Sequence, residues 1–169
     1  VYENEFGTVG VKTRSKNDRL KIIEITTFRS EGRYSDKRHP DKIAFAKTIE
    51  EDLARRDFTI NAMAIKLTNN KKLITGFEIT DPFNGQIDLT KKIIRAVGNP
   101  DQRFNEDALR LLRAVRFAAE LNFAIEPATA AAVKKNAGLL RMIAQERIRD
   151  EFSKIILSDC AQAGIEELE

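Results

Sequence analysis

The 169-residue sequence contains a single cysteine, and none of its apolar runs is long enough to cross a bilayer. Cys160 has no partner for an internal disulfide, which favours a reducing compartment, and we expect the cytoplasm. A membrane-spanning helix needs about 20 consecutive apolar residues. Residues 1–5 also lack the basic stretch and apolar run of a signal peptide. The sequence therefore predicts a protein with no membrane partner and no visible targeting signal.

Several kinds of catalytic site are also missing from the sequence. The lone histidine, His39, has no cysteine or histidine partners at zinc-ligand spacing and no serine or cysteine constellation in reach, so we expect a loop residue. Gly7, Gly10 and Gly98 do not form a phosphate-binding glycine motif. The net charge of +3 permits a polyanionic partner without requiring one.

Strand-like segments come first along the chain, and helical segments follow after Gly98. The former are rich in β-branched and aromatic residues, whereas the latter show helical periodicity. We expect strands at 6–11, 20–28, 73–74, 77–80 and 93–97, and helices at 106–121, from 127 onward and at 145–157. This order indicates an α+β fold, with one domain at 1–98 and an all-helical domain at 99–169.

Shorter signals place turns and helix starts. Thr48 and Glu51 form a capping-box pattern, and Asp57 is predicted to cap a second helical turn over residues 59–63. The Asp-Pro-Phe-Asn-Gly run at 81–85 predicts a turn. Residues 29–40 are polar and show no periodicity, so we expect a loop there.

Charged side chains recur along one face of the helix predicted around residues 103–113. At 100° per residue this face carries Arg103, Glu106, Asp107, Arg110 and Arg113. In one interpretation these residues form ordinary ion pairs on a solvated helix. In the other, Asp107 accepts a hydrogen bond from the exocyclic amine of a base and Arg110 donates to the adjacent acceptor. Such a pair selects cytosine and adenine over uracil and guanine.

A second candidate site lies in residues 52–63. The arginine pair that ends at Arg56, together with the amino end of a helical turn, suits phosphate oxygens, and Asp57 or Asn61 can bond ribose hydroxyls. The alternative is a capping aspartate beside ordinary surface charge. Glu24 lies in an apolar strand, where it either faces solvent or helps to hold a divalent metal.

Four ordered segments carry a family resemblance: residues 24–40, Glu-Asp-Leu-Ala-Arg-Arg-Asp-Phe-Thr-Ile-Asn-Ala-Met-Ala at 51–64, the run at 81–85, and the segment 103–119, which begins Arg-Phe-Asn-Glu-Asp. They resemble bacterial class II tRNA nucleotidyltransferases, the CCA-adding enzymes, and the related bacterial poly(A) polymerases. The resemblance covers about residues 6–157. It implies a partial nucleotidyltransferase head with a palm-like, antiparallel-rich sheet at 1–98 and a helical neck at 99–169.

The resemblance also implies roles for individual residues. Asp107 and Arg110 match the pair that reads the incoming nucleotide. Nucleotide-binding residues are then Arg56, Asp57, Asn61, Arg103, Asp107, Arg110 and Arg113; supporting residues are Glu106, Glu146 and Arg147; and flexible-loop residues are Arg29, Arg33, Asp36 and Arg38. Glu24 matches a catalytic acid that serves as a third metal ligand.

The implied reaction is attack by the 3′-hydroxyl of tRNA on the α-phosphate of CTP or ATP, with release of pyrophosphate. Two Mg²⁺ ions assist it, and no nucleic-acid template is needed. The alternatives are an enzyme that adds only the terminal A, a bacterial poly(A) polymerase and, from another class, a non-catalytic nucleotide- or RNA-binding module.

The sequence departs from the family at both ends. Family members begin with a Gly-Gly stretch, an Arg-Asp pair and an Asp-x-Asp strand that carries the main metal ligands, and none of these precedes Phe6. The tRNA-holding body and tail domains do not follow Leu157, and the first residue is valine. We therefore expect a fragment that binds nucleotide weakly and needs a missing N-terminal segment or a complementary chain for activity.

Overall fold

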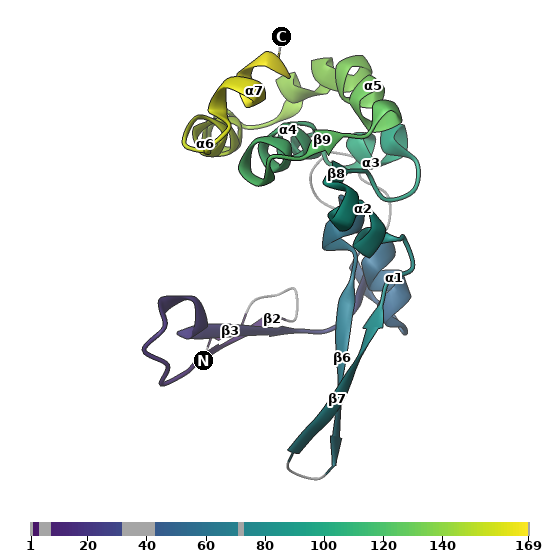
Figure 1. Cartoon of the computed structure of the whole chain (residues 1–169), viewed down its shortest axis with the longest axis vertical. Coiled ribbons are helices and arrows are strands. Elements are labelled where there is room, and N and C mark those ends of the chain that lie inside the picture. Colours follow the sequence, from purple (N-terminus) through teal and green to yellow (C-terminus); the bar gives the residue numbers. More distant parts are fainter. Residues whose placement is uncertain (1, 4–7, 32–42, 71–72, 169) are drawn as a thin grey trace.

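The computed structural model describes residues 2–3, 8–31, 43–70 and 73–168 and combines strands with helices. Helices gather at one end of the molecule, whereas strand pairs extend from the other end (Figure 1). The predicted α+β fold is confirmed. No helix of the described ranges combines the length and the apolarity that a membrane crossing requires.

Antiparallel pairing dominates the strand region. Its strands are β1 (Tyr2–Glu3), β2 (Thr8–Lys12), β3 (Ile22–Thr26), β4 (Arg29–Glu31), β5 (Ile43–Phe45), β6 (Ala64–Asn70) and β7 (Leu73–Thr80). β2 lies between β1 and β3, β4 pairs with β5, and β6 pairs with β7. The antiparallel pairing of β2 with β3 places Glu24 opposite Gly10.

Several strand predictions need correction. The two short strands expected at 73–74 and 77–80 form the single strand β7, and its partner β6 was not predicted. The segment expected to be a loop at 29–40 begins as strand β4. The predicted loop residues Arg33, Asp36, Arg38 and His39 lie outside the described residues. Of residues 93–97, only β8 (Ile93–Ile94) is a strand, and it pairs in parallel with β9 (Ala124–Ile125).

Helices build the other end of the molecule. They are α1 (Ile49–Ala54), α2 (Gly85–Lys91), α3 (Pro100–Glu106), α4 (Leu109–Leu121), α5 (Pro127–Asn136), α6 (Gln145–Ile156) and α7 (Ala161–Glu166), with short 3-10 helices η1 (Asp18–Leu20), η2 (Thr59–Asn61) and η3 (Ala137–Met142). The Thr48 side chain caps α1 by accepting from the Glu51 backbone N–H at 3.3 Å, and Glu51 accepts in return from the Lys47 N–H. The capping-box prediction is therefore confirmed, although its second bond reaches Lys47 and not Thr48.

The turn at 81–85 is held by one carboxylate. Asp81 accepts hydrogen bonds from the backbone N–H groups of Gly85 and Gln86 at 2.7 and 2.9 Å. Burial alone raises the pKa of Asp81, but these bonds outweigh it and the pKa falls below its usual value. A Cβ on Gly85 would lie 2.3 Å from the carbonyl oxygen of Thr59, so only glycine lets α2 approach η2 this closely.

The main hydrophobic core lies among α3, α4, α5 and β8. Phe58 and Ile94 pack there with Phe104 and Leu111, so residues on both sides of position 98 share this core. Val115 of α4 packs with Ile155 of α6 in a neighbouring cluster. The domain boundary at residue 98 stays a prediction.

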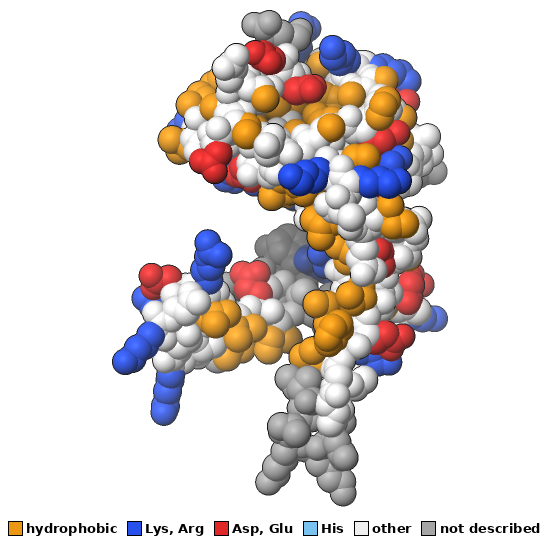
Figure 2. Space-filling view, viewed as in Figure 1, with side chains coloured by type: hydrophobic (Ala, Val, Ile, Leu, Met, Phe, Trp, Pro, Cys, Tyr) orange, Lys and Arg blue, Asp and Glu red, His pale blue; other side chains and the backbone are white. Residues whose placement is uncertain are grey.

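Apolar side chains on the strands β3, β6 and β7 are exposed to solvent. Figure 2 shows them as patches on the extended arms of the molecule, and their members are Ile22, Ile23, Ile25, Ile65, Leu67, Phe77 and Ile79. Within the described residues, these apolar side chains are therefore not covered by another layer.

Candidate functional site

A cavity of about 640 Å³ lies where the end of α1 and η2 face α4 and α6. Six arginines and two aspartates contribute to its lining, so positive charge dominates. The lining residues are Thr26, Arg29, Arg55, Arg56, Asp57, Asn61, Asp107, Leu109, Arg110, Arg113, Phe117 and Arg147. The fold thus brings together two segments that lie about 50 residues apart in the sequence, and a strongly cationic cavity of this kind suits an anionic ligand.

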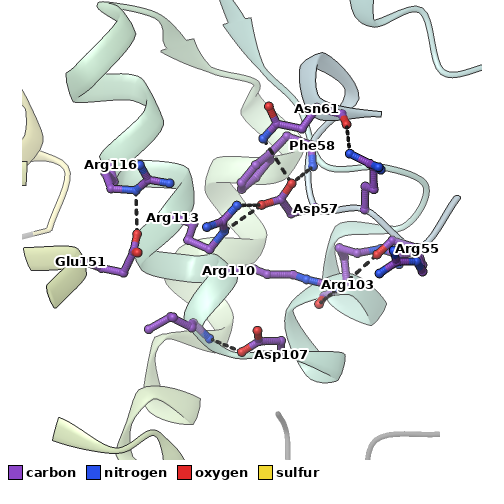
Figure 3. Close-up of polar contacts among 12 residues, drawn as sticks. Arg55, Asp57, Phe58, Asn61, Arg103, Asp107, Arg110, Arg113, Arg116 and Glu151 are labelled. Atoms are coloured by element: carbon purple, nitrogen blue, oxygen red, sulfur yellow. Dashed lines mark hydrogen bonds and ion pairs between the residues drawn. The ribbon is translucent and has the colours of Figure 1, made fainter. Parts of the chain in front are cut away.

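Asp57 and Arg113 connect the two walls. The Arg113 guanidinium donates to Oδ2 of Asp57 from Nε at 2.8 Å, and its Nη2 lies 2.6 Å from the same oxygen (Figure 3). Oδ1 of Asp57 accepts from the Phe58 N–H at 2.9 Å and from the Asn61 amide at 3.3 Å. The prediction that Asp57 caps the next turn is wrong, because Phe58 occupies the cap position of η2 and the carboxylate turns to Arg113.

Arg55 and Arg56 are both held by one buried carboxylate, that of Asp52. Nε and Nη2 of Arg55 donate to its Oδ1 at 3.1 and 2.8 Å. Nη2 of Arg56 donates to its Oδ2 at 3.1 Å, and Nη1 donates to the carbonyl oxygen of Asn61. These bonds fix the two guanidinium groups where they line the cavity.

The helix predicted over residues 106–121 is interrupted at Asp107. This residue has extended backbone angles, φ −136° and ψ 106°, and α4 begins only at Leu109. The interruption has a local cause, because Oδ1 of Asp107 accepts from the Leu109 N–H at 3.0 Å and so satisfies a donor at the new helix start. Its other oxygen faces the guanidinium of Arg147 at 3.5 Å.

Arg110 is nearly buried and is fixed by three acceptors. Nη1 donates to Glu106 at 2.7 Å and to the carbonyl oxygen of Arg103 at 3.2 Å. Nη2 donates to the carbonyl oxygen of Arg55 at 3.1 Å. Because a guanidinium has five N–H donors, these bonds set its plane and leave capacity for another partner. Arg110 and Asp107 both line the cavity, while Arg103 and Glu106 stand behind Arg110.

The helix α6 lies against α4 and contributes one predicted residue to the cavity. Arg147 lines it, whereas Glu146 is exposed and is not among the lining residues. Nε of Arg116 on α4 lies 2.6 Å from the buried carboxylate of Glu151 on α6 (Figure 3). This ion pair joins the two helices behind the cavity.

Glu24 lies on the exposed strand β3 and does not line the cavity. Within the described ranges, no three His, Cys, Asp or Glu side chains come close enough together to hold a metal ion. A divalent metal needs several oxygen ligands. The described residues therefore do not form the magnesium site implied by the resemblance, because Glu24 contributes a single carboxylate.

Phe117 and Thr26 line the cavity without having been predicted. Phe117 lies one turn after Arg113, on the same side of the helix, and its ring lies under the guanidinium groups of Arg113 and Arg116 at 5.1 and 4.0 Å. Helical spacing from Arg113 is a signal that points to Phe117. The position of Thr26, from a distant strand, has no comparable signal.

Comparison with known families decides the relationship. The family described as "Poly A polymerase head domain" matches residues 1–95, more than half of the chain. The chain belongs to this family. A second family, described as "Probable RNA and SrmB-binding site of polymerase A", matches residues 122–169.

Similar proteins and structures are named as CCA-adding enzymes or as a tRNA nucleotidyltransferase. The CCA-adding enzyme of Limosilactobacillus reuteri is 50% identical over 144 residues, which cover 85% of this chain and 34% of that protein. The crystal structure of the Bacillus stearothermophilus CCA-adding enzyme in complex with CTP has a TM-score of 0.77 and 38% identity, covering 97% of this chain and 36% of that one. A tRNA nucleotidyltransferase with a primer tRNA and an incoming ATP analogue has a TM-score of 0.73 and 32% identity, covering 98% of this chain and 43% of that one. The chain thus spans about a third of the length of the curated relative.

Proposed function

We propose that this chain is the nucleotide-binding part of a template-independent tRNA nucleotidyltransferase that adds C and A to the tRNA 3′ end. The observation that carries the proposal is the cavity in which the 55–61 segment faces Asp107 and Arg110. The similar structures were solved with CTP and with a primer tRNA and an ATP analogue, which supports these partners. The cytoplasm is the proposed location.

In this proposal the arginine-rich wall binds the triphosphate. Arg55 and Arg56 present guanidinium groups whose orientation is fixed by Asp52, and such groups pair well with phosphate oxygens. Asn61 lies beside them, with its amide 3.3 Å from Asp57, and is assigned to the ribose. The resulting contacts hold any nucleoside triphosphate and do not distinguish bases.

The opposite wall is assigned to the base. Asp107 is held at the start of α4, and within the described part of the chain its Oδ2 has one contact, a long one of 3.5 Å with Arg147, so a base amine can become its better donor. Arg110 is fixed by its three acceptors and has N–H capacity left for a ring nitrogen or carbonyl oxygen. Cytosine and adenine present this combination of an amine beside an acceptor.

The proposed requirement for magnesium concerns the natural full-length protein. Two Mg²⁺ ions are the proposed cofactor, and the residues described in this chain do not supply their site. Glu24 is proposed as at most one ligand among others. The chemistry that magnesium supplies in phosphoryl transfer is stabilisation of the charge on the attacking and leaving oxygens.

The test is nucleotide incorporation by the natural full-length protein. It is supplied with tRNA that lacks its CCA end, together with CTP alone, ATP alone, or both. The proposal predicts incorporation of C with CTP alone and completion of CCA only with both nucleotides. Runs of A on an unrelated RNA would replace the proposal with a poly(A) polymerase, and no incorporation at all would favour a non-catalytic binding module.

A further inference from the structure

One buried carboxylate ties together three parts of the cavity. Asp52, on α1, is 3% exposed and does not itself line the cavity. Its Oδ1 accepts from the backbone N–H of Arg29 at 3.1 Å and from the side chain of Arg55, and its Oδ2 accepts from Arg56. Arg29, Arg55 and Arg56 all line the cavity. Asp52 therefore lies behind the cationic wall and contacts each of its three arginines.

The connection extends to the opposite wall through Arg55. Its side chain is held by Asp52, while its carbonyl oxygen accepts from the Arg110 guanidinium at 3.1 Å. Arg56 extends it to η2 by donating to the carbonyl oxygen of Asn61 at 3.1 Å. The end of α1 is thus bonded to the residue proposed to read the base and to the segment proposed to bind the ribose.

Asp52 is also charged in the folded protein at neutral pH. Burial works to raise the pKa of its carboxyl group, but the hydrogen bonds from Arg55 and Arg29 and the charge of Arg55 hold the pKa below its usual value. A buried, ionised carboxylate with several donors fixes those donors in direction, because leaving the charge unpaired is costly.

We infer that Asp52 is a positioning residue for nucleotide binding, which acts by orienting Arg55 and Arg56 toward the triphosphate. This inference rests on the proposed function of the cavity. Asp52 is not a catalytic residue, because it lies behind the guanidinium groups and does not line the cavity.

Two effects of Asp52 have opposite signs, which makes the inference testable. As a negative charge close to the cavity, Asp52 repels a triphosphate, so removing the charge should tighten binding if charge alone matters. As the residue that orients the two arginines, it favours binding, so removing it should weaken binding. The direction of the change separates the two roles.

The experiment compares Asp52→Asn with Asp88→Asn in the natural full-length protein. Asp88 is the control: it is also 3% exposed, it pairs with Arg95 at 3.0 Å, and it does not line the cavity. It accepts from the Thr59 hydroxyl at 2.8 Å, and the side-chain oxygen of Asn can keep that bond. We expect Asp52→Asn to raise KM for CTP and ATP about tenfold, with a smaller fall in kcat. Asp88→Asn should lower Tm comparably and leave KM within about twofold.

A second variant tests whether Asp52 acts on nucleotide binding through Arg55. Arg55→Lys keeps the charge but removes the two-nitrogen contact with Asp52. Asp52 is proposed to fix the orientation of Arg55. The variant that combines Asp52→Asn with Arg55→Lys should therefore bind CTP no more weakly than Asp52→Asn alone, whereas independent effects would add.

The outcomes distinguish this inference from the proposed function. If the unmodified protein adds no nucleotide, the proposed function fails before the variants are considered. If the unmodified protein is active and folded Asp52→Asn has an unchanged or lower KM, Asp52 does not position the arginines. Additive effects of Asp52→Asn and Arg55→Lys would overturn the assigned route.

Discussion

The helices α3–α7 and the strand pairs β2–β3 and β6–β7 differ in how far their apolar side chains are buried. Phe104 of α3 is fully buried, whereas Phe77 of β7 is 69% exposed. The helices close on one another, whereas β2–β3 and β6–β7 form extended arms with uncovered apolar side chains (Figures 1 and 2). The wall of the cavity that carries Asp107, Arg110 and Arg113 therefore rests on the main hydrophobic core, and stability and proposed base recognition reside in the same helices.

The sharpest test of this difference is a pair of phenylalanine truncations. Phe104→Ala should lower the free energy of unfolding by about 3–5 kcal/mol, because it leaves a cavity in the main core. Phe77→Ala should change it by less than about 0.5 kcal/mol, because the ring is mostly in solvent already. Urea unfolding followed by circular dichroism measures both. Similar losses for the two variants would show that the exposed strands are packed in solution.

A pair of glycine substitutions probes packing at a smaller scale. A Cβ on Gly164 of α7 would lie 2.6 Å from Cγ2 of Ile155 and 3.0 Å from Cβ of Ala119, so Gly164→Ala should cost about 1–3 kcal/mol. A Cβ on Gly76 of β7 would meet only the exposed hydroxyl of Thr68 at 3.1 Å, and that side chain can turn away. Gly76→Ala should therefore stay within about 0.5 kcal/mol of the original protein in the same unfolding measurement. Equal costs would contradict the tight contact of α7 with α4 and α6.

The smallest predicted effect concerns Glu126, whose carboxylate caps helix α5, and this effect depends on pH. Burial raises the pKa of Glu126, but the bonds from the backbone and hydroxyl of Thr129 and the charge of Arg95 outweigh it, so the pKa is lower in the folded protein. The carboxylate therefore stabilises the fold above its unfolded pKa, and this contribution disappears as pH falls through the folded pKa. Glu126→Gln should cost about 1 kcal/mol at pH 7 and progressively less toward about pH 3.

The matched strand variant for the pH test is Glu78→Gln. Glu78 is exposed and lies 3.9 Å from Lys66 across the β6–β7 pair. Exposed ion pairs contribute little to stability, so this variant should follow the original protein within about 0.3 kcal/mol at every pH. A cost for Glu126→Gln that does not decline in acid would show that its negative charge is not what stabilises the cap.

Local patterns in the sequence predict much of the secondary structure and the composition of the cavity. Segments rich in β-branched and aromatic residues predict β3 and, as two short strands, β7. Helical spacing predicts α4 and α6. Helical spacing does not reveal the break at Asp107. The break depends on a hydrogen bond that the Asp107 carboxylate accepts from the Leu109 N–H at the start of α4. Arg56, Asp57, Asp107 and Arg110 were all predicted as site residues, and the fold brings them to one cavity.

Contacts between distant segments are what the sequence does not provide. Asp57 was predicted to cap a local turn, yet it binds Arg113, 56 residues away, because folding brings the two walls together. From the sequence, Asp52 is only the first residue of the candidate segment 52–63. Its three donors, including a backbone N–H 23 residues away, become visible only in the fold.

The most direct test of the account is the nucleotide preference of Asp107→Ala in the natural full-length protein. KM and kcat are measured for CTP, ATP, UTP and GTP on tRNA that lacks its CCA end. Because Asp107 is proposed to read the base while the 55–61 segment holds the triphosphate, the variant should lose most of its preference for CTP and ATP, about tenfold or more, with a smaller change in KM. Unchanged discrimination against UTP and GTP would contradict the assignment of this cavity wall to the base.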